Sequence, residues 1–289
     1  MSTVAIIGAG TMGHGIAYVS LIAGYDVVLN DVNSETLERA HAHIGNALDS
    51  GVVRGKVTEE MRRDAPMHLS LTTDLDLAVA GANMVIEAAP EILAVKQAIF
   101  ARVSERVPSD TTIATNTSSL SITSIAAAAT SPERVVGMHF FNPVAAMKLV
   151  ELVRGDSTGP DTVASARTFV ESLGKTAIVV GDSPGFATSR LGIVLGLEAM
   201  RMLEQGVASA HDIDTAMELG YNHPVGPLKL TDIVGLDVRL AVADHLHDSF
   251  GGSIYEAPRI LRAMVAAGKL GKKSGNGFYE WETTETAGP

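Results

Sequence analysis

The chain has 289 residues, of which 46% are hydrophobic and 19% are charged, a composition typical of a globular protein with length enough for two domains. Its 33 acidic and 22 basic side chains give a formal charge of −11, which excludes the basic footprint needed for nucleic-acid binding. The chain has no cysteine, which excludes disulfides, thiolate metal sites and cysteine nucleophiles, and we identify no other set of metal ligands.

The first residues enter a predicted strand almost at once. No basic segment followed by a signal-type apolar core precedes that strand, and no charge-free run approaches the length of a membrane span. We therefore expect a cytoplasmic protein that does not bind membranes.

A glycine-spaced turn follows the apolar strand at residues 4–7. It matches the pattern G-x-G-x-x-G, and its residues are Gly8, Ala9, Gly10, Thr11, Met12 and Gly13. We expect the first glycine to permit the tight turn, the second to let a pyrophosphate approach the backbone, and the third to let the next helix press against the sheet. The helix N-terminus would offer free N–H groups to the phosphates. All six residues of the turn are therefore predicted to bind a dinucleotide. The alternative is a strand–turn–helix unit that binds no ligand.

An acid ends the next predicted strand, at residues 27–31. Asp31 stands 23 positions after Gly8, near where a carboxylate accepts hydrogen bonds from the adenosine ribose. The same carboxylate would repel a 2′-phosphate, and no arginine follows closely enough to replace it. The sequence therefore favours NAD over NADP.

Segments of strand and helix type alternate through about the first 180 residues, which indicates a doubly wound parallel sheet. Further strands are expected at residues 84–86, 112–115, 135–141, 149–153 and 177–180. A helix closed by Pro108 is expected to carry an apolar face formed by Ile92, Val95, Ile99 and Val103.

After residues 181–185, helical spacing replaces the strand patterns. One face of a long amphipathic helix carries Ile193, Leu197, Met200 and Leu203. Ser209 and Asp212 resemble a capping box, and the pair Thr231-Asp232 is expected to cap or interrupt a further helix. We therefore predict an α/β fold: a Rossmann-type doubly wound, mostly parallel sheet over residues 1–184, followed by an all-α C-terminal domain over residues 185–289.

A histidine and a glutamate lie in neighbouring predicted strands. His139 ends one strand and Glu151 lies in the next, and the ends of parallel strands are where such sheets bind ligands. A histidine can accept the proton of an alcohol as hydride leaves its carbon, and a nearby carboxylate would orient the ring and stabilise the imidazolium. The alternatives are a hydrogen-bonded structural histidine and a solvent-facing glutamate.

Seven segments follow one another in a recognisable order: residues 8–13, 87–91, 116–119, 137–143, 183–186, 226–227 and 277–279. In these segments the chain resembles the short-chain L-3-hydroxyacyl-CoA dehydrogenase family, which includes 3-hydroxybutyryl-CoA dehydrogenases. The most specific of them is Gly-Met-His-Phe-Phe-Asn-Pro at 137–143. The resemblance covers nearly the whole chain. It implies reversible oxidation of an L-3-hydroxyacyl-CoA to the 3-ketoacyl-CoA, with hydride passing to NAD, as in the β-oxidation of fatty acids.

The resemblance also assigns roles to single residues. It implies that His139 is the general base, that Glu151 orients it, and that Ser118 binds the substrate hydroxyl and lies beside the cofactor. For Ser118 the alternative is a helix N-cap. Asn142 is implied beside cofactor and substrate, although an Asn-Pro pair can merely form a turn.

Two charged residues match family positions near the nicotinamide half of the cofactor. They are Glu91 and Lys96. The alternative interpretation is that both are ordinary solvent-facing charges on the first turns of a helix.

One position departs from the family pattern. Where the family has asparagine three residues after the phenylalanine of Pro-Gly-Phe, this chain has Ser189. A serine donates one hydrogen bond and reaches less far than an amide. The resemblance implies that Ser189 contacts the thioester end of the substrate.

Coenzyme A carries phosphates, so an acidic chain needs local cations to bind it. In the family, a helical stretch after the second strand contacts CoA, and the resemblance makes Arg54 and Lys56 candidate CoA-binding cations there. Lys273 in the C-terminal tail is a third candidate. The alternative is that all three are ordinary solvated surface charges.

The resemblance further implies a homodimer formed through the helical domain. Its amphipathic helices are equally compatible with the core of one monomer. Two rival functions stay open: a dehydrogenase of a free hydroxy acid or sugar acid on the same scaffold, and a non-catalytic NAD-binding protein.

Overall fold

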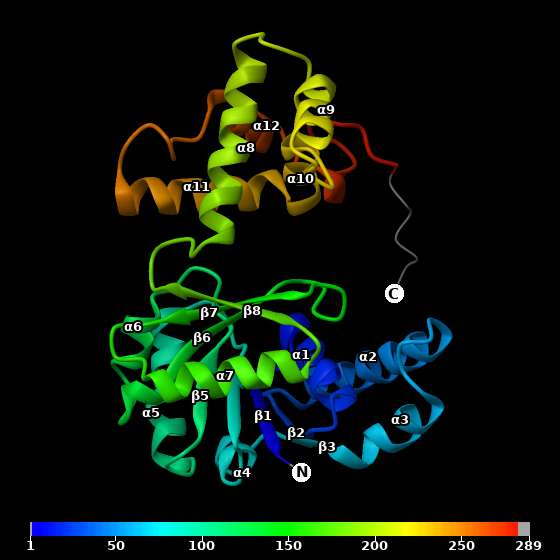
Figure 1. Cartoon of the computed structure of the whole chain (residues 1–289), viewed down its shortest axis with the longest axis vertical. Helices are drawn as coiled ribbons and strands as arrows, with labels where there is room; N and C mark the ends of the chain where they lie inside the picture. The colour runs from blue at the N-terminus through cyan, green and yellow to red at the C-terminus, as the bar shows by residue number, and fades with distance from the viewer. Residues whose placement is uncertain (1, 283–289) are drawn as a thin grey trace. The chain divides into compact units, whose positions relative to one another are not determined.

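The computed structural model describes residues 2–282, and the chain divides into two compact units, Met1–Ser183 and Pro184–Pro289 (Figure 1). We call them the N-terminal unit and the C-terminal unit. Among the described residues, no helix is both long enough and apolar enough to cross a lipid bilayer.

The N-terminal unit is built on one sheet with the strand order β3-β2-β1-β4-β5-β6-β7-β8. Neighbouring strands are parallel, except that β6 and β7 are antiparallel. The first six positions have the order of a dinucleotide-binding sheet, in which ligands bind where the strand order reverses, here between β1 and β4. The strands are β1 (Thr3–Ile7), β2 (Asp26–Asn30), β3 (Leu69–Thr72), β4 (Met84–Glu87), β5 (Thr112–Thr115), β6 (Val135–Phe140), β7 (Leu149–Arg154) and β8 (Thr176–Gly181).

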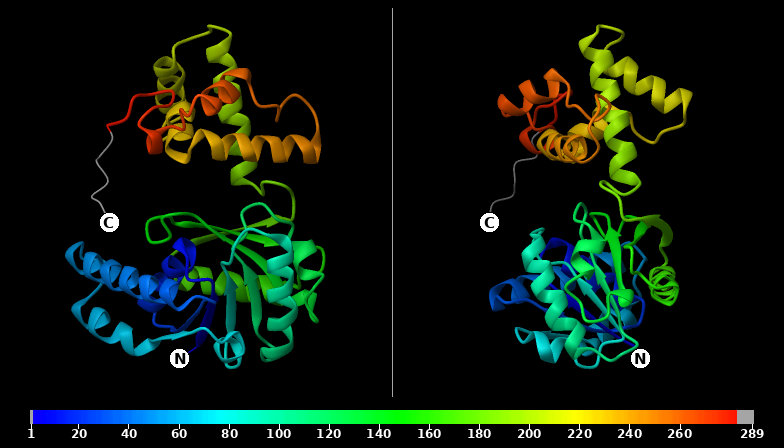
Figure 2. Two further views of the ribbon diagram at one scale, coloured as in Figure 1. Left: turned by 180° about the vertical axis from the view of Figure 1, so that it is seen from behind. Right: turned by 90° about the vertical axis from the view of Figure 1, so that its left-hand side faces the viewer.

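Helices cover both faces of this sheet (Figures 1 and 2). Four of them begin at a side chain that accepts hydrogen bonds from N–H groups of the first turn, namely Asn33, Thr58, Asp74 and Ser121. The helices are α1 (Thr11–Ile22), α2 (Ser34–Val53), α3 (Glu59–Asp64), α4 (Leu75–Val79), α5 (Leu93–Arg106), α6 (Ile122–Ala126) and α7 (Pro160–Ser172), with 3-10 turns at Ala65–His68 and Pro132–Arg134.

The central strands read as continuous apolar runs because both of their faces are covered. Every residue of β4, β5 and β6 is buried. The few polar residues in these strands are therefore buried too, and buried polar groups require partners. Glu87, Thr115 and His139 are three such residues, each at or next to the C-terminal end of its strand.

The apolar face predicted for α5 coincides only in part with its buried face, which includes Val103. Ile92 and Val95 are 55% and 37% exposed, whereas Phe100 and Lys96 are almost fully buried. Hydrophobic spacing misplaced the face because it does not count a lysine as a core residue, and Lys96 lies in the core as the ion-pair partner of Glu87.

The C-terminal unit is helical, and the predicted fold class is thereby confirmed. Its helices are α8 (Thr188–Glu204), α9 (Ala210–Gly220), α10 (Pro227–Val234), α11 (Leu236–Phe250) and α12 (Arg259–Ala266), with a 3-10 turn at Lys272–Ser274. Ile193, Leu197 and Met200 of α8 are buried, as their spacing predicts. Ser209 caps α9, because its Oγ accepts a hydrogen bond from the Asp212 N–H.

The prediction for Thr231-Asp232 is wrong, since both residues are fully buried inside α10 and neither caps nor interrupts it. The Asp232 carboxylate accepts hydrogen bonds from the backbone N–H groups of Phe278 and Tyr279, at 2.9 Å each, and from the indole N–H of Trp281 at 2.8 Å. Asp232 therefore fastens the C-terminal segment to α10. Because its partners lie more than forty residues downstream, local spacing cannot reveal this role.

Candidate functional site

The glycine turn lies between β1 and α1, against the residues that follow β4. Gly8 has a φ of +97°, and a Cβ there would stand 2.6 Å from the carbonyl oxygen of Ala88. A Cβ on Gly13 would stand 1.7 Å from the Gly8 carbonyl oxygen, so this glycine lets α1 pack on the turn itself. A Cβ on Gly10 would meet nothing within 4 Å. The turn is thus open where a pyrophosphate is expected.

The N-terminus of α1 is suited to an anion. Its first N–H groups, those of Thr11, Met12 and Gly13, have no carbonyl one turn earlier in the helix to accept them. The first bond of the helical pattern runs from His14 N–H to the Gly10 carbonyl, at 3.0 Å. No acidic side chain lies in the first turn to compete for the positive end of the helix dipole.

Asp31 follows β2 and is held against the glycine turn. One carboxylate oxygen accepts a hydrogen bond from the Ala9 N–H at 2.9 Å, and the other accepts one from the Asn33 N–H at 3.0 Å. The carboxylate is half-buried and oriented before any ligand is present. It can accept further hydrogen bonds from ribose hydroxyls on its remaining lone pairs.

His139 and Glu151 face each other across the antiparallel pair β6 and β7, where they are register partners. The His139 Nδ1 atom lies 2.9 Å from the Glu151 Oε2 atom. Glu151 is fully buried and His139 nearly so. An ionised carboxylate only accepts hydrogen bonds, so a neutral imidazole bonded to it through Nδ1 carries its proton there and has its lone pair on Nε2.

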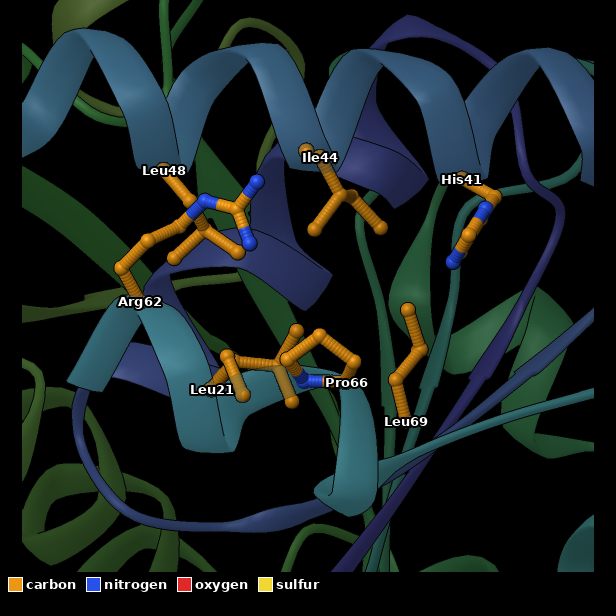
Figure 3. A pocket seen from close by; sticks show the side chains of 9 residues that line it. Leu21, His41, Ile44, Leu48, Arg62, Pro66 and Leu69 are labelled. Carbon is orange, nitrogen blue, oxygen red and sulfur yellow. The ribbon is translucent and has the colours of Figure 1, made fainter. Parts of the chain in front are cut away.

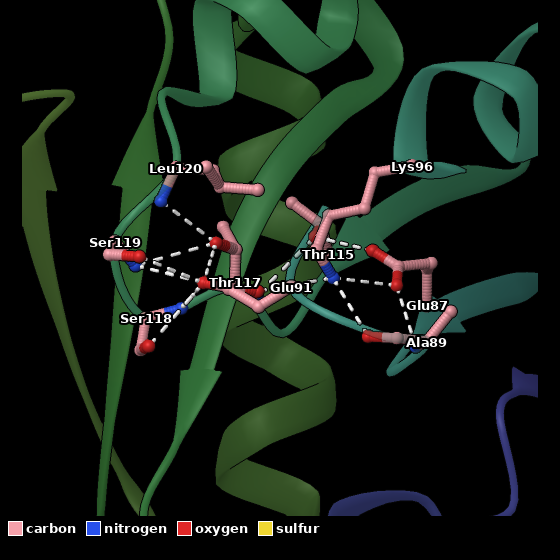
Figure 4. A network of polar contacts seen from close by, with 9 residues as sticks. All are labelled: Glu87, Ala89, Glu91, Lys96, Thr115, Thr117, Ser118, Ser119 and Leu120. Atoms are coloured by element: carbon pink, nitrogen blue, oxygen red, sulfur yellow. Dashed lines mark hydrogen bonds and ion pairs between the residues drawn. The ribbon is translucent and has the colours of Figure 1, made fainter. Parts of the chain in front are cut away.

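Glu91 organises the loop that carries Ser118, as Figure 4 shows. Its Oε1 atom accepts hydrogen bonds from the Thr117 hydroxyl at 2.5 Å, the Ser118 N–H at 2.9 Å and the Ser119 N–H at 3.2 Å. Burial by itself would raise the pKa of Glu91, but the hydrogen bond from Thr117 and the charge of Lys96 outweigh it and lower that pKa. Glu91 is therefore a carboxylate at neutral pH and a firm anchor for the loop.

The alternative of an N-cap for Ser118 is wrong. Helix α6 is capped by Ser121, whose side chain accepts the Ser124 N–H, while Ser118 lies three residues earlier and is exposed. Its hydroxyl lies 3.4 Å from the Glu91 carboxylate. Ser118 therefore does not cap a helix, and its side chain is accessible from solvent.

Lys96 is a buried link between two carboxylates. Its ammonium lies 2.7 Å from Glu87 Oε1 and 3.4 Å from Glu91 Oε2, and it donates to the Ala89 carbonyl at 3.2 Å. The Lys96 side chain is only 1% exposed, so the solvent-facing alternative for this residue is wrong. The Lys96 side chain reaches from α5 toward the carboxylates of Glu87 and Glu91 (Figure 4).

No role was predicted for Glu87, Thr115, Asn116 or Thr117. Glu87 accepts hydrogen bonds from Ala89 N–H and the Thr115 hydroxyl, both at 2.6 Å, and Asn116 accepts one from the Phe140 N–H at 2.9 Å, next to His139. A charged residue at the end of an apolar strand, with a lysine nine positions later, was the available signal for Glu87. Asn142 is exposed and joined to Pro143 by a cis peptide bond.

The candidate cations for CoA differ in their surroundings. Arg54 and Lys56 are both exposed, directly after α2, in the N-terminal unit. Lys273, in the C-terminal unit, forms an ion pair with Asp237 at 2.6 Å. Ser189 is half-buried in the first turn of α8.

An apolar pocket of about 120 Å³ lies elsewhere in the N-terminal unit (Figure 3). Leu21 of α1, Ile44 and Leu48 of α2 and Leu69 of β3 form its walls. Arg62 at its edge is already paired with Asp49. None of the predicted site residues lines this pocket, so it is separate from the candidate site.

Comparison with known proteins decides the family. The family model for the 3-hydroxyacyl-CoA dehydrogenase NAD-binding domain matches residues 3–183, and the model for the C-terminal domain of the same enzymes matches residues 185–281. The chain belongs to the 3-hydroxyacyl-CoA dehydrogenase family. A probable 3-hydroxybutyryl-CoA dehydrogenase of Bacillus subtilis is 43% identical over 277 residues, or 96% of each chain.

Other members of the 3-hydroxyacyl-CoA dehydrogenase family are similar to this chain over nearly its whole length. A 3-hydroxyadipyl-CoA dehydrogenase of Escherichia coli is 43% identical over 99% of this chain and 60% of its own length. The crystal structure of (S)-3-hydroxybutyryl-CoA dehydrogenase from Ralstonia eutropha superposes with a TM-score of 0.93 at 40% identity, covering 98% of this chain and all of that one. Since the N-terminal unit is this family's NAD-binding domain, NAD is the cofactor, as the sequence predicts.

Proposed function

We propose that this chain oxidises L-3-hydroxyacyl-CoA esters, such as 3-hydroxybutyryl-CoA, reversibly to 3-ketoacyl-CoA, with His139 as the general base. The observation that carries the proposal is the buried 2.9 Å hydrogen bond between His139 and Glu151. A histidine held by a buried carboxylate is a base whose orientation and tautomer are fixed before the substrate arrives.

The residues of the N-terminal unit then have separate tasks. Nε2 of His139 takes the proton of the substrate hydroxyl, and Glu151 stabilises the imidazolium that results, because the two charges are close and shielded from water. Ser118 hydrogen-bonds the same hydroxyl and keeps it directed at His139. Bound NAD supplies the hydride acceptor.

The cofactor is held by the glycine turn and the acid after β2. The pyrophosphate lies against Gly10 and the first N–H groups of α1, and the adenosine ribose lies against Asp31. Open space at Gly10 and the prearranged carboxylate of Asp31 support this placement. Asn142 and Glu91 complete the nicotinamide side, while the buried Lys96 acts through Glu91.

The test is NADH formation measured across L-3-hydroxyacyl-CoA esters of increasing acyl length, with free 3-hydroxybutyrate as the control. We expect turnover of the CoA esters and none of the free acid. Equal turnover of the free acid would support the rival dehydrogenase instead. NAD binding without turnover of any of these compounds would support the non-catalytic rival.

The CoA moiety is expected to be held in part by Arg54 and Lys56. Replacing both by alanine should raise KM for the acyl-CoA by roughly 2- to 10-fold at low salt, because two exposed cations lose contact with phosphates. The difference should shrink as salt is added, since exposed charges are screened. The control is Arg39→Ala, an exposed cation on α2, the helix that precedes Arg54. An unchanged KM in the double variant would remove these two residues from the site.

We also propose that the protein is a cytoplasmic homodimer that associates through its C-terminal unit. Large apolar side chains on α8 and at the end of α9 support this. Leu191, Leu219 and Tyr221 are each more than 70% exposed, and their burial against a second copy would stabilise a dimer.

A further inference from the structure

Strand β6 carries the proposed base past the end of its neighbour β5. The last register pair of the two strands joins Thr115 to Gly137, whereas β6 continues to Phe140. His139 lies in this overhanging part of β6. Backbone N–H groups on the edge that faces β5 need other acceptors there, because the residues are buried and β5 no longer supplies its carbonyls.

The side chain of Asn116 takes the place of the missing strand. Asn116 directly follows β5, and its Oδ1 atom accepts a hydrogen bond from the Phe140 N–H at 2.9 Å. Its own backbone N–H donates to the carbonyl of Glu87, the last residue of β4, at 2.7 Å. A chain of hydrogen bonds therefore runs from β4 through Asn116 to the residue next to His139.

The opposite edge of β6 is held by β7. His139 and Glu151 are register partners there, and their side chains meet at 2.9 Å. The ring of Phe141 lies beside the His139 ring, with 4.5 Å between the ring centroids. The bond from Asn116 to Phe140 ties the same end of β6 to the β5 side, so this end is fixed from both sides.

Asn116 also belongs to the segment that carries Ser118. On one side of it, the Thr115 hydroxyl donates to Glu87 Oε2 at 2.6 Å. On the other side, the Ser118 N–H donates to Glu91 Oε1 at 2.9 Å (Figure 4). Asn116 thus lies between two anchored residues, and its side chain links the anchored segment to the end of β6.

Proton transfer depends on the separation between Ser118 and His139. In the proposed function, Ser118 holds the substrate hydroxyl and Nε2 of His139 takes its proton, so the two side chains must stay in a fixed geometry. A misplacement of about 1 Å can lower a rate by about 100-fold, even when its cause lies away from the reacting atoms. A hydrogen bond that couples the segment of Ser118 to the strand of His139 is therefore expected to affect turnover.

We propose that Asn116 is a positioning residue, which sets the separation between Ser118 and Nε2 of His139. It acts through the backbone of Phe140 and takes no part in the proton transfer itself. This inference rests on the proposed function and adds a residue to the machinery of that same site.

The test compares Asn116→Ala with a matched control, Asn83→Ala. The Oδ1 atom of Asn83 also accepts a strand N–H at 2.9 Å, that of Thr3, but at the opposite end of the sheet. We expect Asn116→Ala to lower kcat for 3-hydroxybutyryl-CoA by about 10- to 100-fold, with KM changed by no more than about 3-fold. Asn83→Ala should keep the kcat of the wild-type protein.

Two further variants separate positioning from stability. Asn116→Asp keeps an oxygen where the amide has its Oδ1, so it should bring kcat back to within about 5-fold of the wild-type value. Asn116→Gln keeps the amide, and with it the capacity for hydrogen bonds, but moves the carbonyl outward by one methylene. It should therefore lower kcat by roughly 3- to 30-fold in a folded protein.

Each rate is divided by the number of NAD-binding sites, counted by calorimetry. Partial unfolding lowers the number of sites, whereas misplacement of the base lowers the rate at each site. A merely structural role of Asn116 would thus leave the rate per site unchanged.

Two results would overturn the inference. Equal rates per site in Asn116→Ala and Asn83→Ala, or in Asn116→Gln and the wild-type protein, would show that this link does not set the geometry of the base. An Asn116→Asp protein as slow as Asn116→Ala would show that the acceptor oxygen is not what matters. Absence of turnover in the wild-type protein would instead overturn the proposed function.

Discussion

Replacing His139 by glutamine is expected to lower kcat by about 10²- to 10⁴-fold while NAD still binds. Glutamine can occupy a similar volume and form hydrogen bonds, but it cannot take up the hydroxyl proton at neutral pH. The measurements are the rate of NADH formation with 3-hydroxybutyryl-CoA and the affinity for NAD, obtained separately by calorimetry.

Two variants complete this test. Glu151→Gln should also lower kcat, because a neutral amide stabilises the imidazolium less than a carboxylate does. His41→Gln, an exposed histidine on α2, is the control and should turn over like the wild-type protein. A fully active His139→Gln protein would exclude His139 as the base.

The second large effect is expected for Lys96. Lys96→Met should lower the free energy of unfolding by about 3–5 kcal/mol, because it leaves the fully buried Glu87 carboxylate without its counter-charge. For a unit of this size that corresponds to a fall in Tm of roughly 6–20 °C. Thermal unfolding followed by circular dichroism measures it.

The chain offers a matched control on the same helix. Arg102 of α5 pairs with Asp76 at the surface, and Arg102→Met should cost at most about 1 kcal/mol. Adding Glu87→Gln to Lys96→Met should restore part of the lost stability, since the uncompensated charge disappears. A Lys96→Met protein that melts like Arg102→Met would show that the buried pair does not hold this part of the fold together.

Sequence patterns could predict the central strands because these are buried on both faces and therefore read as apolar runs, whereas β3, none of whose residues is buried, was not predicted. The glycine turn was predictable because its glycines stand at fixed spacing directly after an apolar strand, and Gly13 leaves no room for a side chain beside the Gly8 carbonyl, a demand that is local in the chain. The position of Asp31 was predictable because it directly follows the apolar strand β2, the neighbour of β1 in the sheet.

Other features depend on partners that are distant in the chain. The meeting of His139 and Glu151 requires the antiparallel register of β6 and β7, which apolar patterns do not specify. The burial of Lys96 depends on Glu87, and that of Asp232 on the tail, so both residues look like surface charges or helix breaks when read locally.

The hydrogen bond from Ala9 N–H to Asp31 has a consequence for attempts to redesign cofactor preference. If Asp31 binds the adenosine ribose as we propose, a change toward NADP would begin by removing this carboxylate, which would repel a 2′-phosphate. That same carboxylate braces the turn on which we propose that the pyrophosphate rests. Selectivity and scaffold rigidity are thus coupled in one side chain, and a variant that accepts the phosphorylated dinucleotide needs a new acceptor for Ala9 as well as a new cation.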